Sequence, residues 1–189
     1  NNQLGNDLAI AINVEIKRLV EAGCKYIQVD EPLFARKPHE AIDYGILNLE
    51  KCFDGIENAN VEKITHICCG YPDKLDAVDY PKAPLNSYHK IAKILDDSIL
   101  DTISIEDAHR HNDLNLLEKF KKTKIILGLI KIASSVEETI NEIQMRVDQA
   151  LNHIDPNQLI AAPDCGLGHL PRNLAKKKLK KMVEAVKKY

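Results

Sequence analysis

The chain has 189 residues, with 26 Lys and Arg against 28 Asp and Glu, a formal charge of −2 and a pI near 6.4. This balance argues against a nucleic-acid or membrane surface, since both need clustered basic side chains. Apolar residues make up 44% of the chain, enough for a buried core, and no apolar run reaches the ~18 residues of a membrane span. We expect one domain over residues 1–189, shorter than the ~200 residues at which closed eight-stranded α/β barrels begin.

Helices and strands alternate along the sequence, as judged from helical and strand periodicity. In chain order, the predicted elements are a helix over 7–22, a strand over 26–30, a helix over 38–56, a strand over 63–69, a helix over 87–97, a strand over 102–106, a helix over 114–121, a strand over 124–130, a helix over 136–154, a strand over 159–162 and a helix over 173–188. The segment 70–86 holds three prolines and is expected to be irregular. Strands joined through helices run parallel, so the fold class is α/β with helices covering a parallel sheet.

Several elements carry more detailed expectations. The first helix is expected to bury a stripe of Leu8, Ile12, Ile16 and Leu19. Asp113 is expected to cap the helix over 114–121, and Ser135 the long helix that follows. The lysines of the last helix, Lys178 among them, are expected to form a solvated face.

The five cysteines bear on the compartment and on the chemistry. An odd number of cysteines in a chain of this size predicts free thiols in a reducing compartment, which favours the cytoplasm. Cys24 and Cys52 flank or lie within apolar stripes and are expected in the core. The other cysteines lie near predicted strand ends, where parallel α/β folds collect functional residues.

Four of the five predicted strands end in polar side chains, namely Asp30, His66 with Cys68, Glu106, and Asp164 with Cys165. Residues i and i+2 of a strand share a face, so His66 and Cys68 project together. A buried cysteine or a hydrogen-bonded histidine would explain this pair alone. Together with Glu106 and Cys165, however, the pair makes a four-coordinate zinc set spread over strand ends, which is typical of a catalytic site.

The chemistry of this set favours alkyl transfer to sulfur. A carboxylate is a weaker partner for zinc than thiolates are, so Glu106 is predicted to be the ligand that a substrate displaces. Zinc would strip the proton from an incoming thiol, and the thiolate is the attacking species in S-alkylation. His109 and His111 follow Glu106 closely and are interpreted as either supporting residues or surface residues.

Four motifs together resemble the cobalamin-independent methionine synthase family: Tyr26–Pro32, His66-x-Cys68, Ile103–Glu106 and Pro163–Leu167. The resemblance implies a (β/α)8 TIM barrel with zinc held at its C-terminal rim by His66, Cys68, Glu106 and Cys165. It also implies that Asp30 contacts the amino group of homocysteine. The family reaction moves a methyl group from a methylated polyglutamyl folate to the homocysteine thiolate.

Two departures from the family pattern leave the alkyl donor open. Lys131 and Ala133 stand where the family has an Asp and a His, which puts methylfolate in doubt. Residues 68–73 are more similar to shorter relatives, a group that includes the epoxyalkane:coenzyme M transferases. Methyltransferases that take a methyl group from a corrinoid are a further relative. The predicted function is a zinc-dependent thiol S-alkyltransferase, foremost a methyltransferase acting on homocysteine, with methylfolate, a methylcorrinoid or an epoxide as the donor.

The resemblance also interprets the short length of the chain. It assigns the five predicted strands as the fourth to eighth of the barrel, so this chain is expected to form an incomplete barrel with three strands missing at the N-terminus. A non-catalytic zinc-binding barrel fragment and a metal-independent decarboxylase-type barrel are the alternatives. The oligomeric state does not follow from the sequence.

Overall fold

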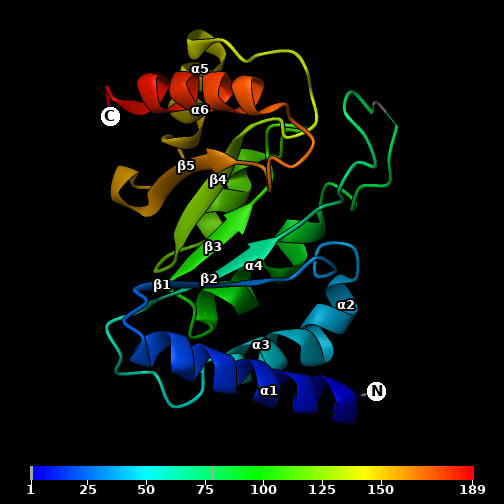
Figure 1. Cartoon of the computed structure of the whole chain (residues 1–189), viewed down its shortest axis with the longest axis vertical. Coiled ribbons are helices and arrows are strands. Elements are labelled where there is room, and N and C mark those ends of the chain that lie inside the picture. The colour runs from blue at the N-terminus through cyan, green and yellow to red at the C-terminus, as the bar shows by residue number, and fades with distance from the viewer. Residues whose placement is uncertain (1, 78) are drawn as a thin grey trace.

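Five parallel strands form one twisted sheet in which sequence neighbours are also spatial neighbours (Figure 1). The structure is a computed structural model and describes residues 2–77 and 79–189. The strands are β1 (Tyr26–Asp30), β2 (Glu62–Ile67), β3 (Thr102–Ile105), β4 (Lys124–Ile130) and β5 (Leu159–Pro163). All four pairings are parallel, which confirms the predicted sheet. Within the described residues β1 and β5 each pair with a single strand, so the sheet is open at both edges.

Helical segments connect the strands. They are α1 (Asn2–Glu21), α2 (Pro38–Glu40), η1 (Ala41–Gly45), α3 (Ile46–Cys52), α4 (Ser87–Asp97), η2 (Leu114–Lys119), α5 (Ile140–Ala150), η3 (Pro156–Gln158) and α6 (Arg172–Val186). In Figure 1, α1 and α3 lie beside the β1 end of the sheet, and α5 and α6 lie beside the β5 end. None of the helices in the described ranges is long and apolar enough to cross a bilayer.

The two faces of the sheet differ in burial. One face packs against the helices through side chains that are fully or almost fully buried: Ile27, Ile67, Ile103, Ile105, Ile125 and Leu127. Burying each such side chain stabilises the fold by roughly 1.5–3 kcal/mol. On the other face Ile64 and Ile126 are half-buried and Ile160 is 39% exposed. This second face corresponds to the interior of a barrel, and it carries His66.

Several predicted helices differ in detail from the observed ones. The region 38–56 divides into α2, the π-helical η1 and α3. Asp113 caps the next segment as predicted, by accepting from the Asn115 N–H, but η2 is a 3-10 helix. The predicted Ser135 cap is wrong, because α5 begins at Ile140, where Thr139 and Glu142 form a reciprocal capping box.

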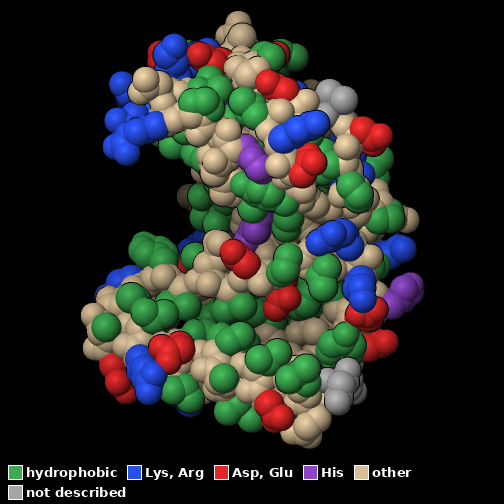
Figure 2. All heavy atoms as spheres, turned by 45° about the vertical axis from the view of Figure 1, so that its right-hand side comes forward, with side chains coloured by type: hydrophobic (Ala, Val, Ile, Leu, Met, Phe, Trp, Pro, Cys, Tyr) green, Lys and Arg blue, Asp and Glu red, His purple; other side chains and the backbone are tan. Residues whose placement is uncertain are grey.

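The buried face of α1 agrees with the predicted stripe only at Ile16. Leu8 is 54% exposed and Leu19 is 43% exposed, whereas Ala9 and Ile16 are buried. The rotation of the helix is fixed by Asn13, whose Nδ2 donates to the carbonyls of Cys52 and Asp54 at 2.9 and 2.8 Å. Hydrophobic side chains consequently gather on the lower part of the surface in Figure 2, which is hollowed between this region and the α5–α6 region.

Lys178 does not belong to the solvated lysine face expected on α6, although Lys176, Lys177 and Lys180 are exposed as expected. Its side chain is fully buried, and its Nζ donates to the Lys131 carbonyl at 3.0 Å and to Glu138 Oε1 at 3.2 Å. A buried ammonium needs such partners, because losing its hydration costs several kcal/mol. Lys178 therefore ties α6 to the segment that follows β4, a role that composition does not reveal.

Candidate metal centre

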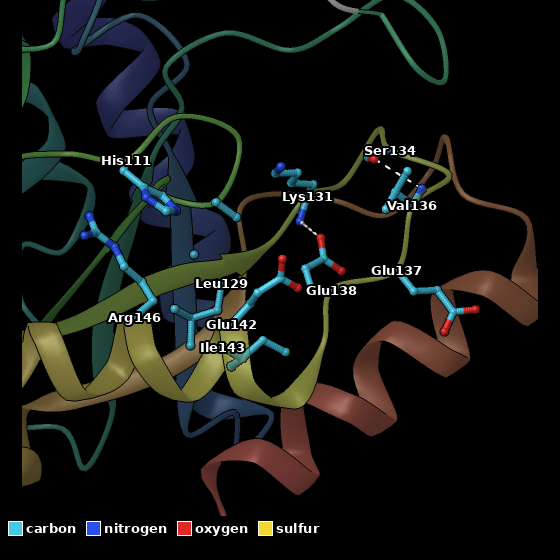
Figure 3. Close-up of a pocket in the computed structure, with 12 residues that line it drawn as sticks. His111, Leu129, Lys131, Ser134, Val136, Glu137, Glu138, Glu142, Ile143 and Arg146 are labelled. Atoms are coloured by element: carbon cyan, nitrogen blue, oxygen red, sulfur yellow. Dashed lines mark hydrogen bonds between the residues drawn. The ribbon is translucent and has the colours of Figure 1, made fainter.

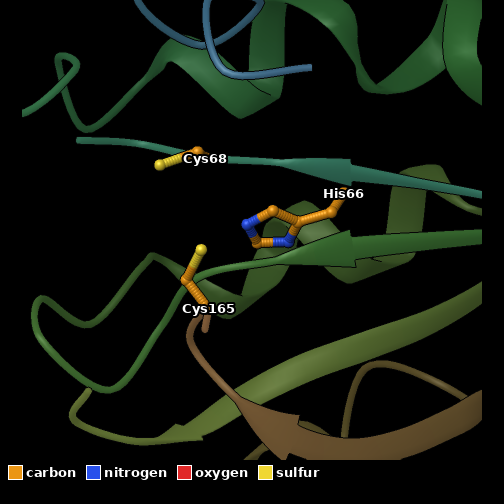
Figure 4. A group of neighbouring side chains, drawn as sticks. All are labelled: His66, Cys68 and Cys165. Carbon is orange, nitrogen blue, oxygen red and sulfur yellow. The ribbon is translucent and has the colours of Figure 1, made fainter. Parts of the chain in front are cut away.

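His66, Cys68 and Cys165 come together at the C-terminal edge of the sheet (Figure 4). His66 lies within β2, Cys68 follows that strand directly, and Cys165 follows β5. Their ligand atoms all lie within 4.8 Å of one another. In a flat sheet, strands three positions apart would be separated by roughly 14 Å. The curvature of the sheet therefore brings Cys165 to the pair on β2.

The imidazole of His66 is oriented by its neighbour on β3. Its Nδ1 lies 2.9 Å from Ser104 Oγ, and the two residues are partners in the parallel register. The other ring nitrogen, Nε2, is buried and has no hydrogen-bond partner within the described part of the chain. Buried polar atoms are seldom left unpaired, and metal-binding histidines typically use one nitrogen for the metal and the other for a supporting hydrogen bond. The ring therefore fits a metal.

The pKa values of the Cys68 and Cys165 thiols are shifted in opposite directions. A hydrogen bond to Cys165, together with burial and the nearby charge of Glu106, raises the pKa of Cys68 well above its usual value. The same hydrogen bond lowers the pKa of Cys165, although burial opposes this. Cys165 is therefore the first of the two thiols to ionise. A cation entering between the sulfurs would displace their protons, as metal binding to thiols generally does.

Glu106 lies next to the group of three but is held by other partners. It is 5% exposed, and its Oε1 accepts the backbone N–H of Cys69 at 2.8 Å. Its Oε2 lies 3.5 Å from the Nζ of Lys82. The Cys69 side chain itself is buried in the core, on the opposite side of the chain from Cys68, as the alternation predicts. Cys52 is likewise buried, and Cys24 is half-buried.

Tyr88 on α4 fixes the ends of two strands relative to each other. Its hydroxyl donates to the Ile67 carbonyl at 2.7 Å and accepts from the Glu106 N–H at 3.1 Å. The side chain is 2% exposed. It therefore sets the distance between the Cys68 segment and Glu106. The sequence offers no signal for this role, since a tyrosine in an amphipathic helix is read simply as a core residue.

Asp164 fixes the third segment of the site. Its carboxylate is fully buried and accepts the backbone N–H groups of Asp107, Ala108 and His109 at 2.8, 2.8 and 2.7 Å. Burial raises its pKa to about 6, although these hydrogen bonds act in the opposite direction. Asp164 thereby joins the segment that carries Cys165 to the segment that follows Glu106. The sequence marked Asp164 only as a polar residue at a strand end.

Asp30 lies at the edge of this arrangement. It ends β1 and is the register partner of His66, but its side chain is exposed and accepts from Gln28 Nε2 at 2.8 Å. The next residue, Glu31, has a pKa raised to about 7 by burial and by the charge of Asp30. Asp30 is thus free to meet a ligand, while the neighbouring carboxyl is partly withdrawn from water.

His109 lies beside Ala133, one of the two positions that depart from the family pattern. Its Nε2 accepts the Ala133 backbone N–H at 3.2 Å. Burial, together with the positive charges of Lys82, Lys131 and Lys178, lowers the pKa of His109 to about 4. The imidazole is therefore neutral at pH 7, and it is a supporting residue of this loop rather than a surface residue. His111, by contrast, is exposed.

The neutral state of His109 predicts a pH dependence of stability. Its pKa is lower in the folded chain than in the unfolded chain, so the unfolded chain binds more protons between about pH 4 and 6.5. The contribution of His109 to stability should then fall as the pH is lowered through this window. His109→Gln is expected to reduce that loss by about 1 kcal/mol, a figure that allows for solvent screening.

Urea unfolding at pH 7 and at pH 4.5 measures this difference. His111→Gln, at an exposed position on the same loop, is the matched control and should retain the full loss. Equal losses in the wild-type chain and in His109→Gln would show that His109 is not the group responsible.

A separate hollow lies between β4 and α5 and is shown in Figure 3. Its volume is about 190 Å³, and Lys131, Glu138 and Arg146 are among its lining residues. Arg146 forms a buried ion pair with Asp107, its Nε lying 2.5 Å from Oδ2. The Lys131 backbone N–H donates to Glu138 Oε1 at 2.9 Å. These contacts hold the loops that follow β3 and β4, so the residues around the hollow have a structural role at the rim of the sheet.

A curved parallel sheet with an imidazole and two thiols at its C-terminal edge defines the class of parallel α/β barrel proteins with a rim site. Residues 1–188 match the family described as the catalytic domain of cobalamin-independent synthases. The chain belongs to this cobalamin-independent methionine synthase family, as the sequence motifs predicted. The predicted TIM-barrel class is confirmed as well.

Similar proteins agree with this assignment. A methionine synthase of Pyrococcus abyssi is 30% identical over 182 residues, which is 96% of this chain and 48% of the relative. A methionine synthase of Saccharolobus solfataricus is 33% identical over 184 residues, with 96% and 49% covered. The structure of a B12-independent methionine synthase from Shewanella sp. W3-18-1, in complex with selenomethionine, has a TM-score of 0.85 and 30% identity, covering 99% of this chain and 55% of that one. The chain thus spans about half the length of the curated relatives it matches.

Proposed function

We propose that this chain carries the metal and thiol site of a zinc-dependent methyltransferase that methylates homocysteine. The observation that carries the proposal is the convergence of His66, Cys68 and Cys165, with the Nε2 of His66 buried and unpaired among the described residues. Two thiols and an imidazole form a donor set that suits zinc. We further propose that residues 1–189 form one domain and that the protein is cytoplasmic. All five cysteines are free, which favours a reducing compartment.

In this proposal His66, Cys68 and Cys165 hold zinc, and Glu106 is a weaker fourth ligand. Bound zinc would lower the pKa of a substrate thiol and so supply a thiolate at neutral pH. Ser104 holds the ring of His66 in the orientation that directs Nε2 toward the thiols. Tyr88 and Asp164 hold the three segments at a fixed separation. These residues pre-organise the site before any substrate arrives.

Asp30 is proposed to bind the amino group of the thiol substrate. Its carboxylate is exposed, and its register partner on β2 is His66. An ammonium group placed there would form a charge-assisted hydrogen bond with the Asp30 carboxylate. This contact would select an amino-acid thiol over a simple thiol.

The alkyl donor is proposed to be a methyl donor, with methylfolate and a methylcorrinoid as the two candidates. Ala133 stands where the family has a histidine, and the neighbouring His109, which packs in the loop after Glu106, is neutral at pH 7. An epoxide is the alternative donor, in line with the similarity of residues 68–73 to the epoxyalkane transferases.

Mass spectrometry of the product tests the proposal. The zinc-replete chain is incubated with homocysteine and methylfolate, with homocysteine and methylcobalamin, and with coenzyme M and epoxypropane. Methionine formed with either methyl donor, and lost in Cys68→Ser, supports the proposal. Opening of the epoxide would identify the alternative activity instead. Stoichiometric zinc binding without any alkylated product would identify a non-catalytic zinc-binding fragment.

A further inference from the structure

Glu106 faces a cation that the metal site does not require. The Nζ of Lys82 lies 3.5 Å from Glu106 Oε2, and the two side chains are only 13% and 6% exposed. The same ammonium lies 4.8 Å from the ring centroid of Tyr80. An ion pair this well buried is screened little by solvent, so the carboxylate is held firmly on the lysine side.

The backbone of Lys82 is itself fixed beside the end of β2. The N–H of Ala83 donates to the Cys69 carbonyl at 2.8 Å. Gly70 has φ +152, and a Cβ there would lie 2.2 Å from the Pro81 carbonyl oxygen and 3.3 Å from the Cα of Lys82. Only glycine permits this close approach. The backbone contacts of Cys69 and Gly70 with residues 81–83 therefore place Lys82 beside Glu106.

We propose that Lys82 is a positioning residue that competes with zinc for the carboxylate of Glu106. The inference rests on the proposed zinc site and adds the ion pair with Lys82 as the interaction that makes Glu106 the exchangeable ligand. When a thiol substrate takes the fourth position, the carboxylate returns to the Lys82 ammonium and the Cys69 N–H, where it already lies in this structure. The displaced charge therefore keeps a partner in a buried site, which would otherwise be costly.

A zinc titration against a chromophoric chelator tests this proposal without measuring activity. Lys82→Met is expected to bind zinc about tenfold more tightly, since a charged hydrogen bond no longer competes for Glu106. Lys82→Arg keeps the charge and should stay within about threefold of the wild-type chain. Lys90→Met, at an exposed lysine of α4, controls for the loss of one positive charge and should leave the affinity unchanged.

The double variant Lys82→Met/Glu106→Gln separates competition from simple electrostatics. If Lys82 acts through Glu106, the double variant binds zinc as Glu106→Gln alone does. If the double variant bound zinc more tightly than Glu106→Gln does, the proposal would be overturned. An unchanged or weaker zinc affinity in Lys82→Met would also overturn it. If the wild-type chain bound no zinc, the proposed function would fail as well. Zinc binding that depends on Cys68 but not on Lys82 would remove the inference alone.

Discussion

Cys165→Ser is expected to weaken zinc binding by at least about a hundredfold, because even outer partners of metal ligands contribute ten- to a hundredfold. Its sulfur is one of three donors that lie within 4.8 Å of one another, and it reaches the site from a strand three positions away in the sheet. A serine hydroxyl is a harder and less easily ionised donor than a thiol. Cys68→Ser should have an effect of similar size. Competition with a chelator, with metal analysis of the purified chains, measures both.

Cys24→Ser is the matched control for this prediction. Cys24 is half-buried, as Cys165 is, but it is not part of the group of three. Its replacement should leave the zinc affinity within about twofold, as expected for a change away from the site. Full zinc occupancy in both Cys68→Ser and Cys165→Ser would refute the proposed centre. A loss of zinc in only one of them would leave the sulfur replaced in that variant as the single thiol ligand.

Asp164→Ala is expected to reduce the free energy of unfolding by at least about 3 kcal/mol. The change leaves the backbone N–H groups of Asp107, Ala108 and His109 without their acceptor, and each unpaired buried donor costs ~1–3 kcal/mol. Urea unfolding in the presence of a chelator measures this loss independently of zinc. The zinc affinity should fall too, because Asp164 holds the segment of Cys165.

Two further variants test the origin of that loss. Gly128→Ala keeps the carboxylate but would place a Cβ 2.0 Å from Asp164 Oδ1, so it should reproduce much of the destabilisation. Asp113→Ala removes an exposed cap that accepts one backbone N–H and should cost only about 1 kcal/mol. Stability of Asp164→Ala within 1 kcal/mol of the wild-type chain would contradict the account of the buried carboxylate.

The predictions from sequence succeed where one element determines the outcome. The alternation of periodicities predicts the parallel sheet, and the strand period of two correctly separates His66 and Cys68 from the buried Cys69. They fail where a neighbouring element decides. The rotation of α1 depends on hydrogen bonds from Asn13 to the carbonyls of Cys52 and Asp54, and hydrophobic spacing alone selects a different face. The start of α5 is a failure of another kind, because the capping box of Thr139 and Glu142 is a local pattern within the same helix.

The candidate site divides in the same way. The sequence predicts its candidate ligands, since His66, Cys68, Glu106 and Cys165 all stand at predicted strand ends and within motifs that resemble one family, and the structure brings three of them together. The supporting partners could not be predicted from the sequence. The roles of Tyr88, Lys82 and Asp164 depend on contacts between segments far apart in the chain.

The sequence by itself determined the family and the parallel α/β class, and it singled out the side chains that are proposed to carry the chemistry, because each depends on residue type and on spacing within one element. Only the tertiary structure decided that Cys165 reaches the pair on β2, that Glu106 is held by Lys82 and that Lys178 is buried. The physical reason is that sheet curvature and loop packing set the distances between elements, and these are the sum of many weak contacts. A short chain with an open sheet can therefore bring three candidate zinc ligands together.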